Sequence, residues 1–116
     1  MPSNALPPAR RIRRRREFQR VFDAGRRAHG RYLTIIAAPA PGPDSRLGIV
    51  ASKKLGGSVV RNRAKRLIRE VFRTHASPEM ASDLVVIPKG TALQVQVAEI
   101  VSDYGTTLKR LNLSRR

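Results

Sequence analysis

One stretch of the chain, residues 58–75, carries two kinds of side chain at helical spacing. It reads SVVRNRAKRLIREVFRTH, and at about 100° per residue its apolar and basic side chains fall on neighbouring arcs. The apolar arc comprises Val60, Ala64, Leu67, Ile68, Val71 and Phe72. The basic arc comprises Arg61, Asn62, Lys65, Arg66, Arg69 and Arg73, with Arg63 near its far border. Such a helix buries one side in a core and leaves a cationic side open.

The basic arc has almost no acidic partners. Exposed helix faces commonly pair opposite charges one turn apart, whereas Glu70 is the only acidic residue of this segment. Arginine offers a planar fork of donors that matches a phosphate group. Asn62 can donate to and accept from a 2′-hydroxyl or a base edge. The pattern favours a face that binds folded RNA over an ordinary solvated face. A membrane-surface helix fits less well, because the core needs the apolar arc.

The whole chain is strongly basic. Its 116 residues suit one domain, and the formal net charge is +16. This charge repels itself unless a polyanion lies nearby, so nucleic acid is the first candidate partner and an anionic membrane the second. No apolar run approaches the ~18 residues of a membrane span, and no apolar stretch follows the N-terminal arginines as in a secretory signal. We therefore expect a cytoplasmic protein without disulfides, since the sequence has no cysteine.

The N-terminal residues divide into two parts. Residues 1–9 hold three prolines and no periodicity, which predicts a disordered lead-in. A basic run follows at Arg10, Arg11 and Arg13–Arg16. Since nothing acidic nearby compensates this run, it favours a phosphate-contacting arm over a flexible, solvated one. We expect one domain over residues 10–113 and a basic tail at 114–116.

Apolar spacing and turn residues predict six elements. Helices are expected over residues 15–24, 58–75 and 94–111, and strands over 31–37, 47–52 and 84–87. Through the proline-rich loop 38–45, the second strand would run antiparallel to the first. Gly25 is expected to end the first helix in a left-handed conformation, and Ser58 to cap the start of the second.

The ionisable residues form no catalytic motif. The eight acidic residues are scattered, and Glu99 with Asp103 fits an exposed helix edge better than a metal site. His29 and His75 fall in different elements. A protein nuclease needs metal ligands, or a base beside a nucleophile. We therefore expect neither catalytic nor metal-binding residues in this chain.

The stretch SKKLGGSVVRNRAKRLIREVF, residues 52–72, resembles the signature of the bacterial ribonuclease P protein family. The core of the signature is Arg61-Asn62-Arg63, followed by Lys65-Arg66-Leu67-Ile68-Arg69. Three flanking pieces also look like family segments: Glu17-Phe18 with Val21-Phe22 and Gly25, Arg46-Leu47-Gly48-Ile49, and the strand from Asp83 to Ile87. The resemblance spans residues 10–111.

The resemblance implies an α+β fold, a small α/β sandwich in a single domain. A mixed four-stranded sheet would pack against helices, as in the second domain of a small-subunit ribosomal protein. A left-handed β–α–β crossover would carry the helix with Arg61, Asn62 and Arg63. General experience favours right-handed crossovers in about 98% of such units, so on this point the resemblance overrides the general rule.

The resemblance also implies a function. Family members are subunits of ribonuclease P, an endoribonuclease in which an M1-type catalytic RNA, with Mg²⁺, removes the 5′ leader of precursor tRNA. The protein would bind that ribonuclease P RNA and the precursor tRNA, with no cofactor and no small-molecule substrate of its own. The residues that bind the RNA subunit would be Arg61, Asn62, Arg63, Lys65, Arg66 and Arg69. A cleft between the first helix and the sheet would hold the leader, lined by Phe18, Phe22, Thr34, Ile36 and Lys53.

Some alternatives stay open. Phe18 and Phe22 could simply pack in the core. Ile36 stands where some family members carry a tyrosine, which removes one stacking platform for a base. A small ribosomal protein would share the size and charge of this chain. An architectural DNA-binding protein would bind duplex DNA as well as structured RNA.

Overall fold

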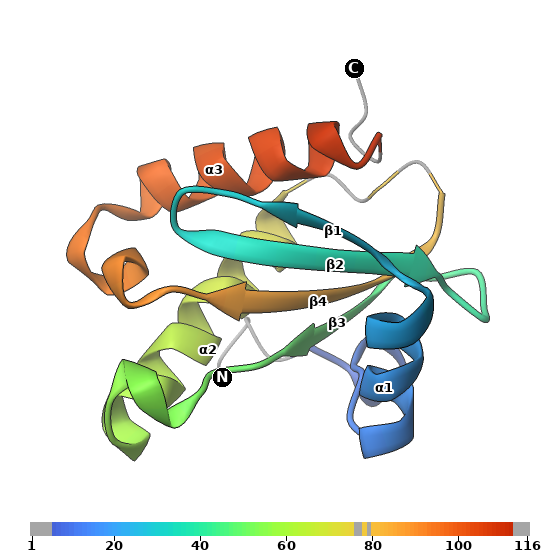
Figure 1. Ribbon diagram of the computed structural model, residues 1–116, viewed down its shortest axis with the longest axis horizontal. Helices are drawn as coiled ribbons and strands as arrows, with labels where there is room; N and C mark the ends of the chain where they lie inside the picture. Colours follow the sequence, from blue (N-terminus) through green and yellow to red (C-terminus); the bar gives the residue numbers. More distant parts are fainter. Residues whose placement is uncertain (1–5, 76–77, 79, 113–116) are drawn as a thin grey trace.

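Four strands form one mixed sheet in the computed structural model, which describes residues 6–75, 78 and 80–112 (Figure 1). The strands are β1 (Arg26–His29), β2 (Leu33–Pro39), β3 (Arg46–Ile49) and β4 (Ser82–Pro88), in the order β1-β2-β4-β3. Strands β1 and β2 are antiparallel, as are β2 and β4, whereas β3 and β4 are parallel. The helix α2 (Ser58–Thr74) connects β3 to β4. The predicted mixed four-stranded sheet with a β–α–β unit is therefore confirmed.

Helices pack against both faces of the sheet. On β2, Leu33 and Ile35 point into the core that α2 and α3 (Val97–Arg110) share, whereas Ile36 points toward α1 (Arg15–Ala24). This division follows from the alternation of side chains along a strand. The helices contribute to the larger core through Ile68, Val71, Phe72, Ile100, Tyr104 and Leu108. The predicted apolar arc of α2 therefore faces the sheet and α3.

The first two predicted strands, β2 and β3, run antiparallel as expected, but they do not pair with each other. Strand β3 pairs with β4, and β4 lies between β3 and β2. Local patterns could not show this insertion, because β4 follows α2 in the chain. The patterns also give no sign of β1, since this strand, RRAH, has only one buried side chain, that of Ala28.

Two predicted helix ends are wrong as well. Gly25 has a φ of −82°, which is not left-handed. A Cβ at this position would lie 2.4 Å from the carbonyl oxygen of Val21 and 2.8 Å from Cγ2 of Ile36, so close packing of α1 on β2 requires glycine there. Ser58 is the first residue of α2 rather than its cap, and Gly57 occupies the N-cap position without a side-chain hydrogen bond.

The N-terminal segment lies along the outer edge of β3. The amide of Ile12 donates to the carbonyl of Leu47 (2.9 Å), and Leu6 is buried in the larger core. The guanidinium of Arg10 lies 5.3 Å from the ring centre of Phe72, at the end of a turn formed by Pro8–Arg10. Within the expected disordered lead-in, Leu6 therefore packs in the core and Pro8 begins a turn. Residues 1–5 and the predicted tail at 114–116 lie outside the described residues.

Candidate nucleic-acid interface

The side of α2 that faces away from the sheet carries the basic arc. Its side chains are exposed at Asn62, Arg63 and Arg66 and half-buried at Arg61, Lys65 and Arg69. Among the described residues, none of these five cations forms an ion pair with a carboxylate. The ion pair of α2 joins Arg73 to Glu70, with 2.6 Å between nitrogen and oxygen. The basic side of α2 is therefore open to a partner, as the sequence pattern indicates.

Two features of this side favour an anionic partner. Burial lowers the pKa of Arg69, and the guanidinium groups of Arg11 and Arg66 lower it further. The Nε of Arg61 is buried and has no hydrogen-bond partner among the described residues. A buried donor without an acceptor costs about 1–3 kcal/mol, and neighbouring cations repel one another. An anion with several acceptor oxygens would relieve both costs.

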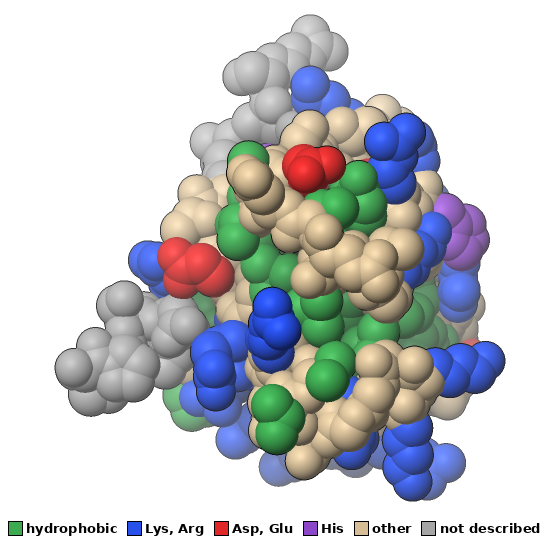
Figure 2. Space-filling view, turned by 90° about the vertical axis from the view of Figure 1, so that its left-hand side faces the viewer, with side chains coloured by type: hydrophobic (Ala, Val, Ile, Leu, Met, Phe, Trp, Pro, Cys, Tyr) green, Lys and Arg blue, Asp and Glu red, His purple; other side chains and the backbone are tan. Residues whose placement is uncertain are grey.

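The basic surface extends from α2 to the turn that precedes the helix. Figure 2 shows the end of the molecule where this helix begins, with lysine and arginine side chains around exposed hydrophobic ones in the lower half of the view. Lys53 and Lys54 are exposed in the turn just before α2, and Val59 in its first turn is 80% exposed. The predicted site residue Lys53 therefore lies next to the basic side of α2.

The two phenylalanines of the predicted leader cleft both belong to α1. Phe18 and Phe22 are half-buried and pack against a small core cluster that includes Ile36. A Cβ on Gly48 would lie 2.7 Å from the ring of Phe18, so this ring rests directly on β3. Ile36 itself is only 1% exposed. Core packing thus accounts for Ile36 and for part of each phenylalanine ring.

A row of residues beside α1 crosses the sheet and reaches solvent. His29 pairs with Thr34, and Thr34 pairs with Ile87, while Val50 follows the end of β3. The imidazole of His29 is exposed, and its Nδ1 lies 3.0 Å from Oγ1 of Thr34. Ile87 and Val50 are half-buried. We call His29, Thr34, Ile87 and Val50 the sheet row. Sequence patterns did not indicate His29 here, because β1 carries no strand pattern.

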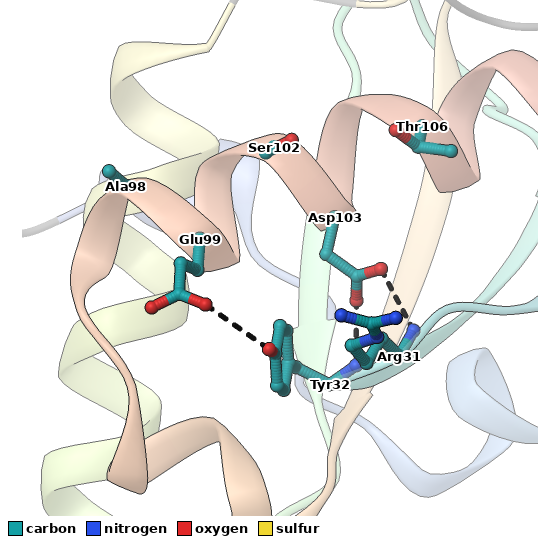
Figure 3. A pocket seen from close by; sticks show the side chains of 7 residues that line it. All are labelled: Arg31, Tyr32, Ala98, Glu99, Ser102, Asp103 and Thr106. Atoms are coloured by element: carbon teal, nitrogen blue, oxygen red, sulfur yellow. Dashed lines mark hydrogen bonds between the residues drawn. The ribbon is translucent and has the colours of Figure 1, made fainter.

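The acidic pair on α3 holds a turn of the chain in place (Figure 3). The carboxylate of Asp103 accepts hydrogen bonds from the backbone amides of Arg31 and Tyr32, both at 2.8 Å. The hydroxyl of Tyr32 donates to Glu99 (3.3 Å). Figure 3 shows these side chains around a pocket of about 340 Å³ between α3 and the turn from β1 to β2. Both carboxylates therefore have structural partners.

Across the described residues, no three His, Asp or Glu side chains gather in a way that could hold a metal ion. None of the helices described has the length and apolar character needed to cross a bilayer.

Residue 11 is a basic position that the helical pattern of α2 could not reveal. Arg11 lies on the N-terminal segment and forms a parallel bridge with Leu47 of β3. With Lys65 and Arg69 of α2, it lines a pocket of about 150 Å³ at the edge of the sheet. A sequence signal for this anchoring exists, since Ile12 is the single hydrophobic residue between Arg10 and Glu17.

The chain is similar to proteins of one family over nearly its whole length. Residues 6–112 match the family described as Ribonuclease P. The ribonuclease P protein component of Syntrophus aciditrophicus is 35% identical over 111 residues, which covers 95% of this chain and 93% of that protein. The corresponding protein of Staphylococcus aureus is 36% identical over 105 residues and 90% of each chain.

Solved structures of RNase P proteins have a similar fold. The RNase P protein of Staphylococcus aureus superimposes with a TM-score of 0.80 at 33% identity, covering 91% of this chain and 98% of that one. The RNase P protein from Thermotoga maritima has a TM-score of 0.75 at 30% identity, covering 86% of this chain and 96% of that one.

Proposed function

Because this chain belongs to the ribonuclease P protein family and is thus a subunit of ribonuclease P, we propose that it binds the RNA subunit through α2 and the 5′ leader of precursor tRNA on the sheet row. An M1-type RNA subunit, with Mg²⁺, would cut the phosphodiester bond in the cytoplasm. The protein would bind no cofactor of its own. Its part would be to screen the repulsion between two polyanions and to keep the leader in place.

The observation that carries this proposal is the unpaired cationic side of α2. Arg61, Arg63, Lys65, Arg66 and Arg69 have no carboxylate partner among the described residues, while the other side of the same helix is fixed in the core. A rigid helix holds these donors at regular spacing, which suits the phosphates of a folded RNA. In an ordinary surface helix, several of these cations would form ion pairs with carboxylates of the same protein.

The sheet row suits a single strand. Its half-buried apolar half, Ile87 and Val50, can lie under a base, beside the half-exposed ring of Phe22, and the exposed ring of His29 stands at the other end. Base–aromatic stacking contributes about 1–3 kcal/mol per base and tolerates any sequence. Lys53 stands near the end of the row as a phosphate partner. The sequence of the leader differs between tRNAs, so a surface that can stack on any base suits it.

Reconstitution tests the proposed function. The protein is added to ribonuclease P RNA at a Mg²⁺ concentration too low for the RNA to act alone, and cleavage of a precursor tRNA is followed. We expect 5′ cleavage to be restored, and an equal amount of an unrelated structured RNA to compete poorly. Equal binding to duplex DNA, or association with ribosomal RNA alone, would contradict the assignment.

Phe22→Ala tests the leader surface. In the reconstituted enzyme we expect this variant to bind precursor tRNA roughly tenfold more weakly, because one base–aromatic stack is lost. Affinity for mature tRNA, which has no leader, should stay the same. Phe22→Leu keeps most of the packing on α1 and should show the same selective loss, which separates stacking from folding. Equal losses on both tRNAs would rule out leader binding at this ring.

A further inference from the structure

A small pocket opens at the outer edge of β3, where the N-terminal segment passes between α1 and α2. Its volume is about 150 Å³. The wall is apolar, and the cations are Arg11 from the N-terminal segment and Lys65 and Arg69 from α2. The other lining residues are Leu6, Ile12, Phe18, Leu47, Gly48 and Ile49. We call this the edge pocket.

The lining of the edge pocket contains three cations and no carboxylate. The carboxylates of the neighbouring elements are engaged elsewhere. Glu17 of α1 accepts from the amides of Arg13 and Arg14 and from Arg46. Glu70 of α2 pairs with Arg73. The positive charge of the pocket is therefore uncompensated within the described residues.

One of the three cations is oriented by a hydrogen bond, and the other two are half-buried on α2. The Nε of Arg11 donates to the carbonyl of Leu6 (2.6 Å), which orients the guanidinium and leaves its two terminal nitrogens for another partner. Lys65 and Arg69 stand one turn apart on α2 and are half-buried. Pre-oriented donors lose little conformational entropy when an acceptor binds.

We propose that the edge pocket binds one nucleotide unit of RNA, with its phosphate held by Arg11, Lys65 and Arg69 and its ribose against Ile12, Phe18 and Ile49. This inference rests on the proposed function, because the RNA is the subunit that α2 binds. The N-terminal segment thereby becomes part of the RNA interface.

The salt dependence of RNA binding tests the phosphate contact. We expect the double variant Arg11→Gln/Arg69→Gln to bind ribonuclease P RNA about tenfold more weakly, with the slope of log affinity against log salt reduced by about one. Arg31→Gln/Lys109→Gln removes the same charge from exposed positions outside the pocket, and we expect less than a twofold loss. Equal losses in the two double variants would overturn the proposal.

Two further variants serve as controls that separate the loss of charge from a loss of folding. Arg11→Lys/Arg69→Lys keeps both charges and should keep the salt slope. Lys65→Gln leaves the N-terminal segment untouched and should lower affinity by a few-fold. If the charge-retaining variant loses as much of the slope as the glutamine variant, electrostatic binding in the pocket is refuted.

A titration without the RNA subunit gives an independent readout. Uridine 3′-monophosphate is added to the full chain, and the Nε–H signals of arginines and the backbone amides are followed by NMR. We expect shifts at Arg11, Arg69, Gly48 and Ile49, smaller ones at the same positions with inorganic phosphate, and none with uridine. Equal shifts at Arg31 would refute the site. If the chain binds ribonuclease P RNA no better than other RNAs, the proposed function is wrong. The titration would still show whether the edge pocket binds a nucleotide.

Discussion

At the scale of single residues, a buried carboxylate ties α1 to the sheet. Asp83 of β4 is fully buried and accepts hydrogen bonds from Nε and Nη2 of Arg46 at 2.9 and 2.7 Å. Arg20 of α1 reaches the same carboxylate. The carboxylate of Asp83 raises the pKa of Arg46 above its ordinary value. In a chain of net charge +16, the carboxylate of Asp83 thus stabilises the fold and takes no part in the RNA interface.

Glu17 makes the same region sensitive to acid. The amides of Arg14 and Arg13 donate to its carboxylate, with a smaller contribution from Arg46, and together they lower its pKa to about 2. A carboxyl whose pKa falls on folding stabilises the native state above its unfolded pKa, and this stability is lost as the pH falls from about 4.5 toward about 2. We expect Glu17→Gln to lower the free energy of unfolding by about 1–2 kcal/mol near neutral pH, after allowance for solvent screening.

Urea unfolding at several pH values measures this effect. The difference between wild type and Glu17→Gln should shrink toward zero at about pH 2, where the wild-type carboxyl becomes protonated. Asp44→Asn, which removes one carboxylate at an exposed loop position, serves as the control. A constant difference across the whole pH range would show that the carboxylate charge has no role.

At the scale of elements, α1 is seated on β3 through one close contact. The ring of Phe18 occupies the space above Gly48, where a Cβ would approach Cε1 to 2.7 Å and Cβ of Ile12 to 3.0 Å. The residue type at position 48 is therefore set by a helix thirty residues earlier in the chain. The same ring lines the edge pocket, so this packing also shapes the RNA interface.

Gly48→Ala tests that seating. We expect a loss of about 1–3 kcal/mol in the free energy of unfolding, because the added methyl group overpacks the contact between α1 and β3. The combination with Phe18→Ala should recover part of this loss, and the coupling between the two sites appears in a double-mutant cycle. Gly42→Ala is the matched control, since a Cβ there meets nothing within 4 Å. Additive effects of the two changes would contradict direct contact.

At the scale of the whole molecule, the chain has a net charge of +16, and the part that the structure describes has a radius of gyration of 13.1 Å. The screening length is about 30 Å at about 0.01 M salt, so at low salt most cations of the molecule repel one another, whereas at physiological ionic strength it is about 8 Å. Ion pairs such as Arg73–Glu70 offset this repulsion only locally. Folding and RNA binding should therefore respond to salt in opposite directions.

Salt titration measures both responses. Between about 10 mM and about 200 mM NaCl, we expect the free energy of unfolding to rise by about 1 kcal/mol, since salt screens the repulsion within the protein. Over a similar range, affinity for ribonuclease P RNA should fall by tenfold or more, because counterions released into a more concentrated salt solution gain less entropy. Choline chloride at equal ionic strength controls for specific sodium effects. A parallel decline of stability and affinity would contradict the role given to net charge.

Local sequence determined the helices and the chemistry of the interface. The spacing of Ala64, Ile68 and Val71 is enough to orient α2 on any apolar layer, and this orientation leaves Arg66 and its neighbours outside. Periodicity reports such a division because it depends only on residues three and four apart. The family signature also lies within this one helix and the turn before it.

Tertiary structure alone decided how the strands pair and what surrounds the cations. β4 comes to lie between β2 and β3 because sheet order depends on packing of segments far apart in the chain, which local pattern does not encode. The burial of Ile36, the exposure of His29 and the place of Arg11 beside Arg69 follow from that order. The sequence thus specified a cationic helix, and only the fold set beside it the N-terminal segment that forms the edge pocket.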